Sequence, residues 1–369
     1  MHPQYSHHDE IDLRELFIAL WRGKLIIIAT TIIFAIAAVF YALNSQEWWS
    51  SKAKIAQAQP QDISSYQQQV KQFQPVFDIY QQDGTVLVSD ELNDLIDTVV
   101  LFQRFIDAFN SSDNKRAFLD SSEDFQTFKS KLDADADADA DAESKQDATR
   151  HLYAEWLKKI AAAAEKGAKP VPYNLTLQAT TKQSSYTLLN GYLETIKHKA
   201  HKDALNNLEA MVAAKRNELV QQKRILTSQA QNRLQVEIER AQYALEIAKA
   251  AGLDLPIQTN NSQEIFAIDF GAKALAAKVT ALKSVKNLSV IEPQLQQIDA
   301  KLDMLENLKV DRNIKFQTFR FLENVEEPIT RDKPKRALIA VLGTMLGGML
   351  GVAIVLIRFA FRREEPVAE

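Results

Sequence analysis

Uncharged apolar residues are concentrated in two long runs, one near each end of the chain. The first extends from Leu25 to Leu43 (LIIIATTIIFAIAAVFYAL) over 19 residues, and the second from Ala337 to Ile357 over 21 residues. At a rise of about 1.5 Å per residue, each run forms a helix roughly 30 Å long, the thickness of the hydrocarbon core of a bilayer. Because the rest of the chain is polar, this pattern predicts two transmembrane helices rather than two core helices.

The first apolar run is interpreted as a retained anchor, not as a cleaved signal peptide. The small-residue pattern Ala35-Ile36-Ala37 lies inside the run, whereas a signal-peptide cleavage site follows its apolar core. Trp21 precedes the run, and Trp48 and Trp49 follow it, as expected for aromatic residues at the two membrane interfaces.

Two spans place both termini on the same side of the membrane. Basic residues flank both apolar runs on both sides, so charge does not decide the orientation, but long connecting segments are generally translocated. We therefore expect an inside tail over 1–24, transmembrane helices over 25–43 and 337–357, a translocated domain over 44–336 and a second inside tail over 358–369.

The translocated domain is predicted to be mostly helical. Glycine and proline are absent from residues 85–166 and again from residues 192–251, and both tracts are rich in good helix formers. The second tract carries a heptad-like apolar stripe interrupted by polar residues, which fits a helix packed against neighbours better than an isolated coiled coil. The stripe consists of Leu205, Leu208, Val212, Leu219 and Leu226. Two shorter amphipathic helices are expected over 272–285 and after Pro293.

Strand patterns are few. Apolar and polar residues alternate around Ala53 and Ile55, from Tyr173 to Ala179, and in part over 316–321. The first and last of these segments adjoin the two apolar runs, so we expect both beside the bilayer. If they pair, with the strand at 173–179 joining them, they form a small membrane-proximal sheet. The predicted fold class is α+β, with two terminal transmembrane helices and a long helix protruding from the sheet.

Composition and motifs give no sign of catalysis. The chain has no cysteine, which excludes disulfides and thiolate chemistry, and a net charge of −4 provides no basic field for nucleic acid. The aspartate repeat Asp133–Ala142 has calcium-loop spacing, but Ala138 and Ser144 replace the glycine and glutamate of such loops, so a solvated loop or fraying helix is favoured. His198 and His201 could share a metal but lie among lysines, so surface histidines are favoured. No catalytic residue, cofactor site or metal site is predicted.

The segment PITRDKPKRALIAVLGTMLGGML, residues 328–350, combines a stiff basic connector with glycines inside the second apolar run. Gly343, Gly347 and Gly351 recur every four residues, which predicts a helix face that a second helix can approach closely. Prolines hold the connector extended, and its cations are expected at the lipid headgroups. The connector residues are Pro328, Arg331, Lys333, Pro334, Lys335 and Arg336.

Two segments and the overall layout resemble the Wzz-type polysaccharide co-polymerases, the O-antigen chain-length determinants. EIDLRELFIALWRGKLII, residues 10–27, is similar to the family's entry into its first span, and EEPITRDKPKRALIAVLGTMLGG, residues 326–348, is similar to its proline-rich segment and glycine-rich second span. This chain has fewer prolines there than many members. In the N-terminal segment the matching residues are Asp12, Leu13, Leu16, Leu20, Trp21 and Lys24.

The resemblance implies a non-enzymatic protein of the bacterial inner membrane, with cytoplasmic tails and a periplasmic domain. It implies assembly into a closed homo-oligomeric ring that acts with the O-antigen polymerase (Wzy) on a lipid-linked polysaccharide to set its modal length, without cofactors or nucleic acid. Two alternatives stay open at this point. A two-span membrane sensor would need a cytoplasmic output domain, and a transport adaptor with a helical periplasmic domain would need glycine-rich β modules.

Overall fold

The computed structural model describes residues 13–81, 83–135, 142–167, 171–256 and 266–362. The chain divides into two compact units. The first contains residues 1–56, 109–195 and 321–369, and the second contains residues 57–108 and 196–320. Each unit consists of separate segments because the chain enters and leaves the second unit twice.

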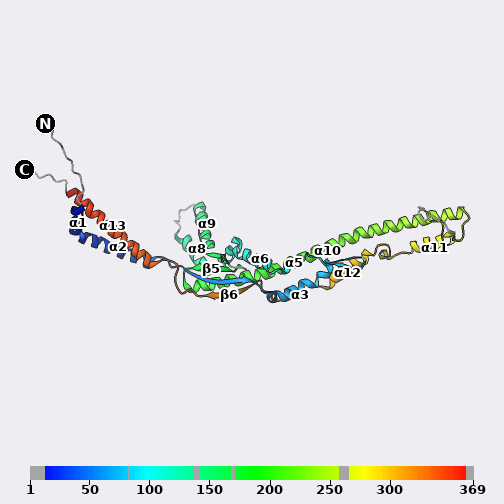
Figure 1. Ribbon diagram of the computed structural model, residues 1–369, viewed down its shortest axis with the longest axis horizontal. Coiled ribbons are helices and arrows are strands. Elements are labelled where there is room, and N and C mark those ends of the chain that lie inside the picture. Colours follow the sequence, from blue (N-terminus) through cyan, green and yellow to red (C-terminus); the bar gives the residue numbers. More distant parts are fainter. Residues whose placement is uncertain (1–12, 82, 136–141, 168–170, 257–265, 363–369) are drawn as a thin grey trace, which may run out of the picture. The chain divides into compact units, whose positions relative to one another are not determined.

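Both apolar runs are helices, and they pack against each other within the first unit (Figure 1). The short α1 (Leu13–Arg22) precedes α2 (Lys24–Asn44) and contacts α13 (Arg336–Arg362). Both α2 and the stretch Arg336–Phe361 are long and apolar enough to cross a membrane. Their outward side chains are largely exposed, as expected for helices whose solvent is lipid.

A four-stranded sheet follows the paired helices in the order β4-β5-β1-β6. Its strands are β1 (Trp49–Gln57), β4 (Ile160–Ala164), β5 (Tyr173–Ala179) and β6 (Phe319–Glu326). β5 runs antiparallel to β1, with Trp49 opposite Ala179, and antiparallel to β4. The α+β class, the small sheet and the strand at 173–179 are therefore confirmed.

The predicted pairing of the first and last strands is present. β1 lies beside β6, and the strand at 173–179, β5, joins the sheet on the other side of β1. Helix packing explains this order, because α2 leads into β1 while β6 leads into α13. Since α2 and α13 lie side by side, the strands attached to them pair directly.

The tract 85–166 is mostly helical, as predicted, but it is divided into several helices. The tract contains α5 (Asn93–Ile96), α6 (Thr98–Asn110), α7 (Ser112–Asp120), α8 (Glu123–Asp135), α9 (Ala142–Lys158) and strand β4, and a short hairpin of β2 (Ile79–Tyr80) and β3 (Val86–Leu87) begins it. Serine caps supply the breaks that glycine and proline do not. Ser111 accepts a hydrogen bond from the Asn114 amide, and Ser122 accepts one from the Phe125 amide. Of the aspartate repeat, residues 136–141 lie outside the described residues.

The first part of α10 (Lys182–Ala250) packs on the sheet in the first unit. The hydroxyls of Ser51 on β1 and Ser185 on α10 are 3.0 Å apart and buried. Tyr192 is fully buried, and its hydroxyl donates a 2.7 Å hydrogen bond to the Phe109 carbonyl. Glu327, just beyond β6, forms a 3.2 Å ion pair with Lys182.

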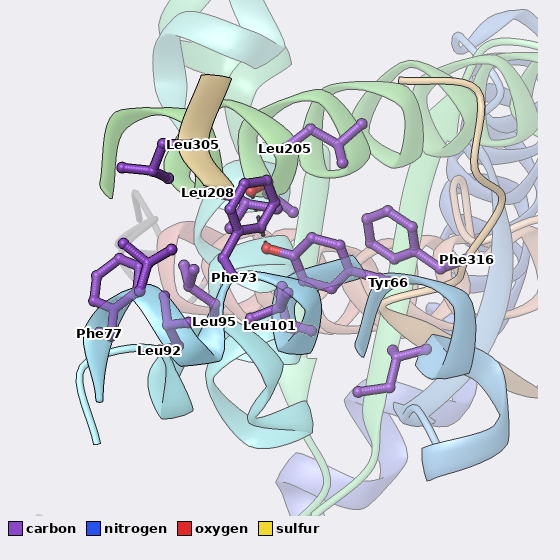
Figure 2. Close-up of a cluster of buried hydrophobic side chains, with 14 of the residues drawn as sticks. Tyr66, Phe73, Phe77, Leu92, Leu95, Leu101, Leu205, Leu208, Leu305 and Phe316 are labelled. Carbon is purple, nitrogen blue, oxygen red and sulfur yellow. Dashed lines mark hydrogen bonds between the residues drawn. The ribbon is translucent and has the colours of Figure 1, made fainter. Parts of the chain in front are cut away.

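The second unit is built around one apolar cluster, shown in Figure 2. The remainder of α10 contributes Leu205, Leu208 and Leu219, and Val212 and Leu226 pack against the same cluster, so the predicted stripe is confirmed as a core face. The other contributors are α3 (Ser64–Gln72), α4 (Gln74–Phe77), α5, α12 (Gln294–Asn307) and the segment around Phe316.

Aromatic packing and one polar anchor hold the centre of this cluster. Tyr66 stacks on Phe316 at a ring-centroid distance of 4.5 Å, and its hydroxyl donates to the Ala204 carbonyl at 3.0 Å (Figure 2). The bond satisfies a hydroxyl that has no exposed surface. A smaller cluster seats α11 (Gly271–Lys283) on the end of α10 through Ala244, Ala248 and Leu275.

Candidate functional site: the paired apolar helices and their connector

The glycines of α13 lie where that helix meets α2. A Cβ atom placed on Gly347 would be 2.8 Å from the Cβ of Phe34, 2.9 Å from the Cα of Thr31 and 3.0 Å from the Thr30 carbonyl oxygen. A Cβ on Gly351 would be 2.8 Å from the Cα of Ile27. Gly343 faces Ala38 in the same way. Side chains at these positions would therefore collide with backbone and Cβ atoms of α2, which cannot rotate away, and at Gly351 also with the Thr30 hydroxyl.

The facing surface of α2 is made of residues whose polar groups are already satisfied. Thr31 donates its hydroxyl to the Ile27 carbonyl at 2.7 Å, and Thr30 donates to the carbonyls of Ile26 and Ile27 at 3.0 and 2.9 Å. These bonds leave nothing unpaired in an apolar environment. The close approach therefore depends on van der Waals packing, as in membrane helix pairs with small residues at the contact.

Two features of this contact escaped the sequence analysis. Gly23, between α1 and α2, also lacks room for a side chain, because its Cβ would be 3.0 Å from the Cβ of Val355. Gly348, although adjacent to Gly347, has only the Thr31 hydroxyl within reach, at 3.7 Å. Gly347 and Gly348 differ only in the side of α13 on which they lie. The sequence alone therefore does not show which residues of α2 each one contacts.

The connector before α13 is tied to the end of α2 through Glu47. One carboxylate oxygen of Glu47 accepts hydrogen bonds from Arg331 at 3.0 Å and from Arg336 at 2.8 Å, and the other accepts from the Trp49 indole at 3.2 Å. Arg336 also donates to the Ala42 carbonyl at 3.2 Å, which satisfies one of the carbonyls left open at the helix end. The sequence analysis identified both arginines but missed Glu47.

A short backbone bridge joins the same two segments. The Trp48 amide donates to the Lys333 carbonyl at 3.0 Å, and the Asp332 amide donates to the Trp48 carbonyl at 2.9 Å. Pro328 and Pro334 are half-buried in the connector, whereas Lys333 and Lys335 are exposed.

The N-terminal residues predicted from the family segment lie on or beside α1. Leu16 and Leu20 are half-buried, and the ammonium of Lys24 lies 5.0 Å from the ring centroid of the exposed Trp21. Leu13 begins the helix, and Asp12 lies outside the described residues.

His198 and His201 do not form a metal site with a third ligand among the described residues. Within the described parts of the chain, no group of three or more histidine, aspartate or glutamate side chains could hold a metal ion. The His201 ring nitrogen is hydrogen-bonded to the Ile314 carbonyl at 2.8 Å, and the ring stacks on Phe316 with centroids 4.4 Å apart. His198 lines a shallow cleft beside it with Asp62 and Lys315.

Two family models match the chain. Residues 9–132 match the model described as Wzz, chain length determinant protein, and residues 294–360 match the model described as a G-rich domain on putative tyrosine kinase. The two matches include the ends of the chain where the paired helices lie.

Known proteins match nearly end to end. A ferric enterobactin transport protein FepE of Escherichia coli is 27% identical over 96% of this chain and 90% of its own length. An ECA polysaccharide chain length modulation protein of E. coli is 26% identical, over 96% of this chain and 97% of its own. A chain length determinant protein of Shigella dysenteriae is 26% identical, over 97% and 95% respectively.

The fold has a solved counterpart. The structure of a full-length bacterial polysaccharide co-polymerase covers 97% of this chain and 99% of its own, with a TM-score of 0.59 and 24% sequence identity. The two chains share a fold over nearly their whole length. The family model matches the N-terminal part of the chain, and the relatives align over almost their whole length. The chain is therefore similar from end to end to proteins named for chain-length determination or modulation.

Proposed function

We propose that this protein regulates the modal chain length of a surface polysaccharide, lipopolysaccharide O-antigen or a related glycan. The observation that carries the proposal is the end-to-end match to relatives named for chain-length determination or modulation. Neither the sensor nor the adaptor alternative is favoured by these relatives.

The protein acts as a scaffold and forms or breaks no bond itself. Its notable contacts are structural ones: helix packing through Gly347 and Gly351, and the Glu47 network with Arg331 and Arg336. Such contacts hold a shape near the membrane. In this proposal the polymerase (Wzy) makes the glycosidic bonds, and this protein affects how many are made before the polymer is released.

In this proposal the protein lies in the bacterial inner membrane, with both tails in the cytoplasm and residues 44–336 in the periplasm. Two helices of membrane-spanning length support this arrangement. A closed homo-oligomeric ring is proposed as the working form, because lateral contacts that close on themselves produce a defined assembly rather than an open filament. The lipid-linked polysaccharide and the polymerase are its proposed partners.

The glycine face and connector have a defined role in this proposal. Gly343, Gly347 and Gly351 bring α2 and α13 together, and the Glu47 network joins the ends of the two helices to the sheet. The sheet is thereby held in one orientation to the membrane, so that neighbouring subunits meet at a constant angle.

The test is the polysaccharide ladder of a null mutant of the source bacterium, separated on a gel. Loss of the preferred length band, restored by the wild-type gene, is the expected result. Complete loss of polymer would instead indicate a polymerase, and an unchanged ladder would contradict the proposal.

A further inference from the structure

A half-buried tryptophan and two lysines form a cluster at the outer ends of the paired helices. The ammonium of Lys159 lies 3.5 Å from the centroid of the Trp48 ring. Trp48 is held by the aromatic neighbours Phe128 and Trp156, at centroid distances of 6.3 and 6.0 Å. Its backbone is bridged to that of Lys333.

Gln178 holds the two lysine-bearing segments together. The backbone amide of Gln178 donates to the Lys159 carbonyl at 3.0 Å, and its side-chain amide donates to the Asp332 carboxylate at 3.0 Å. Lys159 is therefore fixed between α9 and β4, at the end of the sheet that adjoins Trp49 and Ala179.

Among the ion pairs of the described parts of the chain, none joins either lysine to a carboxylate. Glu47 is already engaged by Arg331 and Arg336, and Asp332 accepts from Gln178. Burial lowers the pKa of the Lys159 ammonium. The negative charge of Glu155 raises that pKa by less, and the positive charge of Lys333 lowers it further. An anion beside Lys159 and Lys333 would relieve both the burial cost and the mutual repulsion.

The position of the cluster identifies the anion. Trp48 follows the end of α2 by four residues, and Lys333 precedes α13 by three, so both lie within about 14 Å of chain from the apolar helices. At that depth, once α2 and α13 span a bilayer as proposed above, the abundant anions are phosphate groups of lipids. Tryptophan is likewise typical of this layer.

We propose that Lys159 and Lys333 bind a phosphate group of a membrane lipid beside the Trp48 ring. The ring face occupies one side of the Lys159 ammonium and leaves its remaining N–H groups for phosphate oxygens. The exposed Lys333 supplies a second charge-assisted contact. The same chemistry serves an anionic phospholipid or the diphosphate of a polyprenyl-linked glycan.

The experiment measures lipid binding directly, by native mass spectrometry of the full-length protein released from detergent. Phosphatidylglycerol, phosphatidylcholine and a long-chain polyprenyl diphosphate are titrated separately. Wild type is expected to bind at least one anionic lipid roughly tenfold more tightly than phosphatidylcholine. Stronger binding of phosphatidylglycerol identifies a phospholipid site, and stronger binding of the diphosphate identifies a site for the glycan carrier.

Matched variants decide whether the cluster is the site. Lys159→Met combined with Lys333→Gln should remove the roughly tenfold preference, and Lys159→Arg should retain it. Lys158→Gln, one residue away on the exposed surface, is the control and should change nothing. Equal binding of all three lipids, or an equal loss in the control, overturns the inference. A normal lipid preference in a protein that does not alter the polysaccharide ladder would refute only the proposed function.

Discussion

Replacing Gly347 with alanine or leucine tests the helix contact at its tightest point. The new Cβ would lie 2.8–3.0 Å from three atoms of α2, two of which belong to its backbone. Carbon contacts are ordinarily about 3.5–4.0 Å, so α2 and α13 would have to separate by roughly 0.5–1 Å. Separation on that scale affects every contact along the two helices.

The expected cost follows from overpacking. An inserted methyl group in a well-packed site costs about 1–3 kcal/mol, so Gly347→Ala is expected in that range and Gly347→Leu at or above its upper end. Gly348 provides a matched control on the next position of the same helix, because its nearest neighbour is a flexible hydroxyl 3.7 Å away. Gly348→Ala should lie within about 1 kcal/mol of wild type, since alanine also favours the helix.

The assay is thermal unfolding of the detergent-solubilised protein, followed by the polysaccharide ladder of the complemented null strain. Gly347→Leu should lower the melting temperature by several degrees and weaken the preferred length band, and Gly348→Leu should do neither. If the two leucine variants melt together with the wild type, then the glycine face does not hold α2 against α13, and the reasoning fails.

Three further predictions concern stability. Leu208→Ala, at a fully buried site in the cluster of the second unit, should lower the free energy of unfolding by about 2–5 kcal/mol in denaturant melts. Ile225→Ala, at an exposed site of the same helix, should lower it by less than about 0.5 kcal/mol. Equal losses would mean that the apolar stripe of α10 is not a core face. Burial and a hydrogen bond to Asp120 raise the pKa of Tyr153 to about 12. The contribution of Tyr153 to the stability of the fold is therefore complete below the usual tyrosine pKa near 10 and is lost as the pH rises toward 12. Melting temperatures from pH 9 to 12 should thus fall less steeply for Tyr153→Phe than for wild type, and parallel curves would contradict the assignment. Glu47→Gln should cost about 1 kcal/mol at low salt and less at high salt, because the Arg331 and Arg336 pairs are partly exposed; a salt-independent loss would indicate packing instead.

Periodicity predicted the elements that depend on one continuous pattern. The strand Tyr173–Ala179, the stripe of Leu205 and Leu208, and the helix after Pro293 are present where alternation or helical spacing predicted them. In each case one face of the element is buried and the opposite face is solvated, which gives the pattern its period.

The elements that were missed have two kinds of physical cause, pairing with another segment and local side-chain or turn chemistry. Ile160–Ala164 reads IAAAA, which favours helix by propensity, and it becomes a strand because it pairs with β5. The breaks at Ser111 and Ser122 come from side-chain caps in a tract without glycine or proline. The hairpin turn at Asp83-Gly84, with Gly84 at a φ of 85°, carried a recognisable signal that the sequence analysis did not use.

The candidate site was predictable on one side only. Glycine spacing identified the close-packed face of α13, but its partner surface around Thr30, Thr31 and Phe34 has no special spacing. Glu47 and Lys159 were likewise not identified, because their roles arise from the pairing of segments about 290 and 110 residues away along the chain.

The most direct test of the account is the side of the membrane on which residues 44–336 lie. Because the sequence contains no cysteine, a single introduced cysteine is the only thiol in the protein. Gln229→Cys on the exposed surface of α10 and Arg358→Cys near the end of α13 provide one probe on each side. With a membrane-impermeant maleimide on intact spheroplasts, we predict labelling of the first and protection of the second until the cells are lysed. Protection of Gln229→Cys with labelling of Arg358→Cys, or equal labelling of both, would contradict a periplasmic scaffold held by two membrane anchors.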